Sequence, residues 1–91
     1  MYNLMNAEDP ALPEYPDVPP RTEREATKAA DRVRLCFANA THRGERLWVY
    51  VTEVDGHRYQ GIVDDDPTTD GFPERGAEII FGPEHVLDID P

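Results

Sequence analysis

The chain has 91 residues and therefore forms one domain at most. Its net charge of −10 argues against a direct nucleic-acid ligand, because the phosphates would be repelled. No apolar run approaches the roughly 18 residues of a membrane span, and the chain start lacks the basic and apolar regions of a signal peptide. The one cysteine, Cys36, allows neither an intrachain disulfide nor a cysteine-based metal cluster, so we expect a cytoplasmic protein without membrane contact.

The acidic charge is unevenly distributed along the chain. Residues 55–91 hold ten acids and two bases, whereas residues 32–54 hold two acids and four bases. Such a surface is compatible with a basic protein partner, with mimicry of nucleic acid, or with a salt-rich environment. It is equally compatible with a small domain that only has to stay soluble, so the charge alone identifies no partner.

The first twenty residues are rich in proline and poor in apolar groups. Four of their five prolines recur at every third residue: Pro10, Pro13, Pro16 and Pro19. This spacing is one turn of a polyproline II helix, so we predict a disordered proline-rich arm over residues 1–20 and a β-barrel domain over residues 21–91. The segment from Pro16 to Arg21 also has the PxxPxR form that aromatic grooves bind. Three apolar residues of the arm share its spacing and could dock it on its own domain: Leu12, Tyr15 and Val18.

A short helix and a strand are predicted before residue 40. Residues 22–30 are good helix formers, and Thr22 with Glu25 has the spacing of a capping box, so we expect at most two helical turns resting on the domain. Residues 32–37 alternate between polar and apolar side chains, which predicts the first strand. Its apolar face consists of Val33, Leu35 and Phe37.

A β-hairpin is the strongest local signal in the chain. Residues 47–54 and 58–63 are rich in β-branched and aromatic residues, and they flank Asp55-Gly56, which predicts a type I′ turn. Leu47, Val49 and Val51 share one parity, which we assign to the core, as we do Tyr59, Gly61 and Val63. A glycine inside a strand marks a bulge or a sharp bend, so Gly61 is expected where the sheet curves.

The remaining chain completes a small β domain. Residues 64–71 form an acidic loop and residues 72–76 a turn, and residues 77–81 form a strand with Ala77, Ile79 and Phe81 inward. Gly82-Pro83 ends that strand, and residues 84–89 predict one helical turn followed by a closing strand. The fold class is therefore mainly β: a small SH3-like half-open barrel of four to five antiparallel strands with a short N-terminal helix.

These segments resemble a family of small bacterial and archaeal domains of unknown function, the YegJ-like group. The resemblance covers about residues 20–90 and rests on Trp48-Val49, Asp55-Gly56, Gly61-Ile62-Val63 with Asp66-Pro67, Gly76, and Val86-Leu87-Asp88. Two positions depart from the family pattern, which usually has Asn at Asp65 and Gly-Asp at Gly76-Ala77. The resemblance implies a small β domain and no established activity.

The sequence predicts no catalytic, cofactor or metal site. The run Asp64-Asp65-Asp66 lacks the ligand spacing of a calcium loop and is interpreted as a solvated loop. His42, His57 and His85 lie in or beside predicted turns, and no pair of them has the spacing of a helical zinc site. The chain contains no serine, and Cys36 lies between two apolar strand residues, where a cysteine acts as a small apolar group. We therefore expect a non-enzymatic protein without a cofactor.

An aromatic pair on the outer face of the hairpin is the most informative feature for function. The predicted parity places Trp48 and Tyr50 outside, next to Arg46, and these residue types dominate protein interfaces. Two alternatives remain: the pair could be covered by the chain's own helix or arm, or the sheet could curl so that Trp48 joins a second small core.

Two functional hypotheses follow from these residues. The first is a binding or accessory module that contacts a protein partner through Arg46, Trp48 and Tyr50. The second is an acidic inhibitor, such as an immunity protein, an antitoxin or a phage counter-defence factor, that blocks a basic or nucleic-acid-binding site. Asp64, Asp65 and Asp66 are the candidate acidic contacts in either case.

Overall fold

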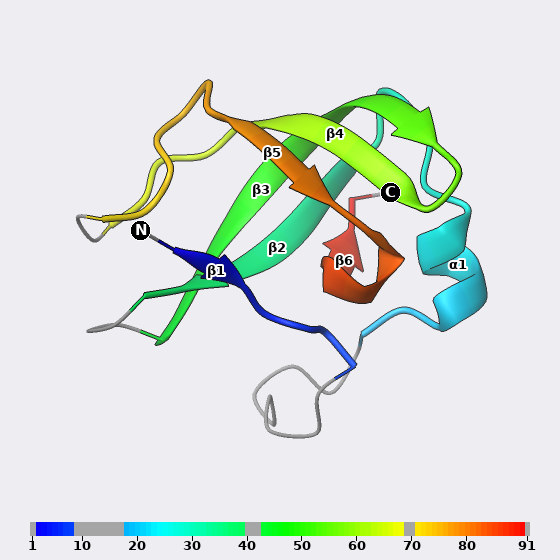
Figure 1. Ribbon diagram of the computed structural model, residues 1–91, viewed down its shortest axis with the longest axis horizontal. Coiled ribbons are helices and arrows are strands. Elements are labelled where there is room, and N and C mark those ends of the chain that lie inside the picture. Colours follow the sequence, from blue (N-terminus) through cyan, green and yellow to red (C-terminus); the bar gives the residue numbers. More distant parts are fainter. Residues whose placement is uncertain (1, 9–17, 40–42, 69–70, 91) are drawn as a thin grey trace.

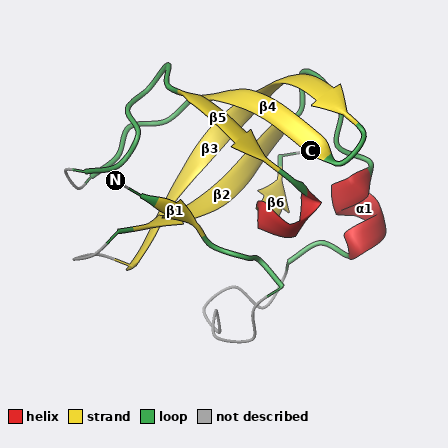
Figure 2. Ribbon diagram, in the orientation of Figure 1, coloured by secondary structure: helices red, strands yellow, loops and turns green. Residues whose placement is uncertain are grey.

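The computed structural model describes residues 2–8, 18–39, 43–68 and 71–90. In this part of the chain an antiparallel sheet curls into a half-barrel, with one short helix beside it (Figures 1 and 2). The strands are β1 (Asn3–Leu4), β2 (Arg32–Ala38), β3 (Arg43–Asp55), β4 (Arg58–Val63), β5 (Glu78–Phe81) and β6 (Val86–Ile89). The helices are α1 (Arg21–Glu25) and the 3₁₀ turn η1 (Pro83–His85). The mainly β half-barrel expected from the sequence is confirmed.

Strand β2 is shared by two partners along one edge. The sheet order is β1-β2-β3-β4-β5, and β6 also pairs with β2. On the side away from β3, β6 pairs with the first half of β2 and β1 pairs with Phe37 and Ala38. The N-terminal and C-terminal strands therefore complete the same edge of the sheet.

The alternating residues form the core as predicted. The inward side chains of β2, β3 and β4 are buried, together with Ile79 and Phe81 of β5 and Val86 of β6. Phe72, from the turn before β5, closes one end of this cluster, and Ala77 packs against it half-buried. The predicted single turn at Pro83 and the closing strand after it are confirmed as η1 and β6.

Gly61 lies where the sheet bends, as predicted. The register between β3 and β4 shifts there, so that Thr52 is an extra residue on β3. A Cβ atom on Gly61 would lie 2.6 Å from the carbonyl oxygen of Tyr50 and 2.6 Å from a methyl carbon of Val49. Only glycine therefore allows the two strands to approach so closely.

The hairpin is confirmed, but its turn lies one residue later than predicted. Asp55 pairs with Arg58, so the two loop residues are Gly56 and His57. Among these four residues only Gly56 has a positive φ, of 61°. A single positive φ at the first loop position is the pattern of a type II′ turn, and the predicted type I′ turn at Asp55-Gly56 is wrong.

The N-terminal segment is ordered over residues 2–8, so the prediction of a disordered arm is wrong there. The amide of Met5 donates to the carbonyl of Cys36 at 2.9 Å, and the amide of Ala7 donates to that of Glu84 at 2.7 Å. The ring of Tyr2 meets Phe37 edge-on at 5.2 Å between centroids. Of the arm residues expected to dock, Val18 packs against a small buried cluster of Ala7, Cys36 and Leu87. Leu12, Tyr15 and three of the spaced prolines lie outside the described residues.

The helix is shorter than predicted and is held by a buried arginine. It begins after Pro20, so Thr22 is not its cap and the expected capping box is wrong. The guanidinium of Arg24 donates to the carbonyls of Pro19 at 2.8 Å and Pro83 at 3.0 Å, and it also contacts Glu8 at 2.9 Å. One side chain thus ties the helix to η1 and to the N-terminal segment.

The close approach at Gly61 yields the first prediction. Gly61→Ala should lower the free energy of unfolding by about 2–3 kcal/mol, because the new methyl group meets backbone and a core side chain that cannot move aside. Urea denaturation followed by circular dichroism measures the change. A variant as stable as wild type would show that β3 and β4 are farther apart at the bulge.

Candidate functional site

The outer face of the sheet brings the candidate residues into rows that cross the strands. The register places Arg32, Tyr50, Ile62 and Glu78 in one row from β2 to β5. The next row pairs Arg34 with Trp48. On the other side of the first row, Gln60 of β4 lies opposite Ile80 of β5.

Trp48 is covered by two arginines of the neighbouring strand. The guanidinium carbon of Arg32 lies 4.7 Å from the centre of the indole ring, and that of Arg34 lies 5.2 Å from it. Such stacking is a cation–π interaction and leaves Trp48 half-buried. The two alternatives considered for Trp48, cover by the helix or arm and burial in a second small core, did not include stacked arginines. Cross-strand neighbours depend on the strand register, which the sequence does not show.

The acidic run binds the protein's own groups and is not a freely solvated loop. Asp64 accepts from the Nε of Arg32 at 3.0 Å and from the Nη1 of Arg75 at 2.9 Å. Asp66 accepts from Arg75 at 3.1 and 3.3 Å. The guanidinium of Arg75 holds the pKa of Asp66 below its ordinary value of 3.8. The candidate contacts Asp64 and Asp66 are therefore committed to ion pairs inside the molecule.

Asp65 and Asp64 also extend the contact between β3 and β4. A carboxylate oxygen of Asp65 accepts the backbone N–H of Trp48 at 3.1 Å. The backbone N–H of Asp64 donates to the carbonyl of Trp48 at 2.9 Å. The third candidate acid thus has a structural role, as do the other two. Arg46, the remaining candidate, lies opposite Cys36 on β2 and is half-buried.

An exposed apolar stripe lies beside Trp48 on the same face. We define the stripe as Tyr50, Ile62 and Ile80, whose exposed fractions are 41%, 37% and 46%. Tyr50 and Ile62 are direct cross-strand neighbours, and Ile80 lies diagonally from Ile62 on β5. Neither isoleucine was among the residues predicted from the sequence to contact a partner, although their parity, opposite to that of the inward residues of β4 and β5, marks them as outward-facing.

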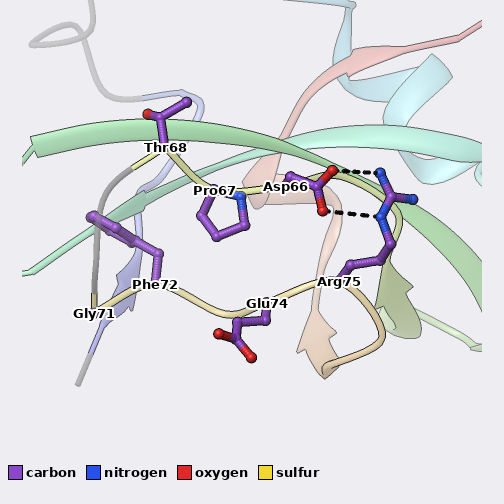
Figure 3. Close-up of a pocket in the computed structure, with 7 residues that line it drawn as sticks. All are labelled: Asp66, Pro67, Thr68, Gly71, Phe72, Glu74 and Arg75. Atoms are coloured by element: carbon purple, nitrogen blue, oxygen red, sulfur yellow. Dashed lines mark hydrogen bonds and ion pairs between the residues drawn. The ribbon is translucent and has the colours of Figure 1, made fainter.

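A pocket of about 460 Å³ lies beside the acidic run, away from the stripe. Figure 3 shows Asp66 and Arg75 pointing toward one another at one end of the pocket, with Pro67 and Phe72 among its other lining residues. At this end of the pocket, the charges of Asp66 and Arg75 neutralise each other in an intramolecular ion pair.

The remaining reactive residues have local roles. Cys36 is buried, and its thiol donates to the sulfur of Met5 at 3.6 Å. The Nδ1 of His85 accepts the backbone N–H of Gly82 at 3.0 Å, and His57 lies 4.0 Å from Glu25. His42 lies outside the described residues. Among the residues that are described, no three histidine, cysteine or acidic side chains form a group that could hold a metal ion.

Comparison of the chain with protein-family models, curated proteins and solved structures found no match. The resemblance to the YegJ-like group therefore stays a prediction. In the described ranges, no helix has the length and apolar character needed to cross a membrane.

The cover over Trp48 yields a prediction about stability. Trp48→Ala should lower the free energy of unfolding by about 2 kcal/mol, because it removes a half-buried ring and two cation–π contacts. Tyr50→Ala, on the same strand and face but more exposed, should cost clearly less. Urea denaturation of both variants measures the difference, and an equal or larger cost for Tyr50→Ala would show that the arginines do not cover Trp48.

The environment of His85 yields a prediction about pH. Burial lowers the pKa of His85 below its ordinary value of 6.5, although the nearby Glu84 carboxylate partly opposes this. The folded state therefore favours the neutral ring, and stability should fall as the pH drops below 6.5 toward the folded pKa. Urea midpoints at about pH 7.5 and 5.5 should differ less in His85→Asn, which keeps an acceptor for Gly82. An unchanged difference would assign the pH dependence to other groups.

Proposed function

We propose that this chain is a non-enzymatic protein-binding module that contacts its partner through the stripe Tyr50, Ile62 and Ile80. The observation that carries the proposal is the exposure of three large apolar side chains side by side on three neighbouring strands. Exposed apolar side chains that are contiguous, with polar groups around them, are typical of protein contact sites. Tyrosine adds a large rigid ring and a hydroxyl group, both of which contribute strongly at interfaces.

The residues around the stripe support it as a rigid platform. Arg32 is fixed by Asp64 at 3.0 Å and by Asp90 at 3.5 Å, and it stacks on Trp48. A platform whose side chains are already held loses little conformational entropy when a partner binds. Trp48 and its arginines thus support the contact surface, and Tyr50 replaces Trp48 as its anchor.

Four further assignments belong to the same proposal. A single Pro-led turn before the last strand and a strand order of β1-β2-β3-β4-β5 favour an SH3-like barrel. The sequence motifs between Trp48 and Asp88 favour the YegJ-like group. We assign the protein to the cytoplasm, where its one buried thiol would stay reduced. The absence of catalysis is favoured by the internal pairing of Asp64, Asp66 and Arg75.

The acidic inhibitor is the weaker of the two functional hypotheses. It needs carboxylates that can face a basic partner, and two of its three candidate acids are occupied by arginines. Its remaining support is the excess of acids in residues 55–91. Contacts of that kind weaken steeply in salt, whereas an apolar contact does not.

A pull-down from host lysate with the tagged full chain tests the proposal. Ile62→Lys should reduce capture of the partner at least tenfold, because it places a charge at the centre of the stripe. Val54→Lys is the matched control: Val54 is also 37% exposed, but it pairs with the inward-facing Tyr59 and lies outside the stripe.

The wash conditions separate the two hypotheses. A partner that binds the stripe should remain bound at about 0.5 M salt, whereas a basic enzyme held by carboxylates should be released. Equal capture by wild type and Ile62→Lys would contradict the proposed function.

A further inference from the structure

We propose that an extended segment of the partner protein pairs with the outer edge of β5 and becomes an additional strand of the sheet. The segment carries an apolar side chain opposite Ile80 and a lysine or arginine opposite Glu78. The inference rests on the proposed function, because it names the kind of partner that the stripe receives and how that partner is held. It is carried by the outward backbone groups of β5, the exposed apolar side chain beside them, and an exposed carboxylate.

The sheet has two edges, and within the described part of the chain the fold covers only one of them. The outer edge of β2 is paired with β1 and β6. β5 is the last strand in the other direction, and among the described strands it pairs with β4 alone. An uncovered strand edge presents backbone N–H and C=O groups to which another extended chain can bind. The outer edge of β5 is therefore where a partner can add a strand.

The ladder between β4 and β5 shows which backbone groups of β5 point outward. The N–H of Val63 donates to the carbonyl of Ala77 at 2.9 Å, which fixes this pair as a hydrogen-bonded position. Bonded and non-bonded positions alternate along an antiparallel ladder, so the N–H and C=O groups of Glu78 and Ile80 point away from β4. No described residue donates to or accepts from these outward groups, which we call the free edge.

The side chains beside the free edge determine which segment fits. Ile80, a member of the stripe, is 46% exposed, and Glu78 is exposed on the same outer face. Glu78 accepts from the side-chain amide of Gln60 at 3.3 Å and forms no ion pair with a described residue. Residues directly opposite each other on neighbouring strands place their side chains on the same face. An added strand can therefore extend the stripe with an apolar side chain next to Ile80 and pair a cation with Glu78.

The charge distribution favours a basic segment and sets its order. Residues 55–91, which include β4 and β5, hold ten acids and two bases. An acidic side chain opposite Glu78 would destabilise the strand pair, so the carboxylate also excludes acidic segments. All strand pairs of the described sheet are antiparallel. A segment that continues this pattern has, from its N-terminal side, an apolar residue, any residue, and a lysine or arginine.

Hydrogen exchange of the full chain, followed by NMR, tests the free edge without a ligand. The backbone N–H groups of Glu78 and Ile80 should exchange at least about tenfold faster than that of Ile79, because only the last is directed at β4. Equal protection of the three groups would show that another part of the molecule covers the edge, and would overturn the inference.

A short capped peptide tests the added strand. It has an isoleucine two residues before a lysine, and threonine at every other position. A matched peptide carries N-methyl groups on the backbone nitrogens of that isoleucine and lysine, which removes two hydrogen-bond donors and keeps every side chain. In an NMR titration the first peptide should bind with a dissociation constant below about 1 mM and slow exchange at Glu78 and Ile80. The N-methylated peptide should bind at least about tenfold more weakly.

Charge reversal tests the contact with the peptide lysine. Glu78→Lys should weaken binding of the first peptide at least about fivefold, because it places two cations opposite each other. A peptide with glutamate in place of the lysine should bind this variant more tightly than it binds wild type. Glu23→Lys is the matched control, since it makes the same charge change at an exposed position of α1 and should bind the first peptide as wild type does. Circular dichroism confirms that each variant is folded.

Two results of the titration would overturn strand addition. One is the absence of binding by the first peptide up to about 1 mM, and the other is equal binding of the two peptides. Equal binding that Ile62→Lys abolishes would assign the contact to the side chains of the stripe alone. The proposed function is judged separately, by whether Ile62→Lys loses a lysate partner that Val54→Lys keeps.

Discussion

Arg32 is the side chain on which the outer face of the sheet depends. From one position on β2 it stacks on Trp48 of β3, pairs with Asp64 after β4 and pairs with Asp90 after β6. These residues are separated by up to 58 positions in the chain, so the guanidinium joins segments that local structure alone would not hold together. Arg32 and Asp64 are both partly exposed, so each pair contributes little energy on its own. These ion pairs act mainly on geometry, because together they hold the outer face of the sheet in the orientation that exposes its apolar side chains.

The same ion pairs change the interpretation of the acidic composition. Asp64 links Arg32 to Arg75, and Arg75 in turn holds Asp66, so the three adjacent aspartates are part of the folded structure. Adjacent side chains in an extended segment point to opposite sides, which allows these separate contacts. Asp65 points to the amide of Trp48 while its two neighbours reach arginines on other elements. Each of the three aspartates, which look like a solvated charge cluster in the sequence, thus makes specific contacts in the fold.

The sequence was sufficient for most of the sheet and insufficient for its outer surface. Strict alternation predicted β2, β3, β4 and β5 and their buried residues, since a period of two allows only one face to be apolar. It could not show which residues face each other across strands, so the arginine cover on Trp48 was missed. The N-terminal strand β1 was missed for another reason: two residues are too short to carry a period, and β1 forms only because β2 offers an unpaired edge. The turn was placed one residue early, because Asp55-Gly56 and Gly56-His57 are distinguished only by the pairing of Asp55 with Arg58.

The net charge of −10 limits what the apolar stripe can do. Two copies carry the same excess of acid, so long-range repulsion opposes their approach through the stripe. The same repulsion keeps a chain with Tyr50, Ile62 and Ile80 exposed from aggregating. The acidic charge and the stripe therefore act together: repulsion opposes contact between copies, and the apolar side chains stay available for a partner of another kind.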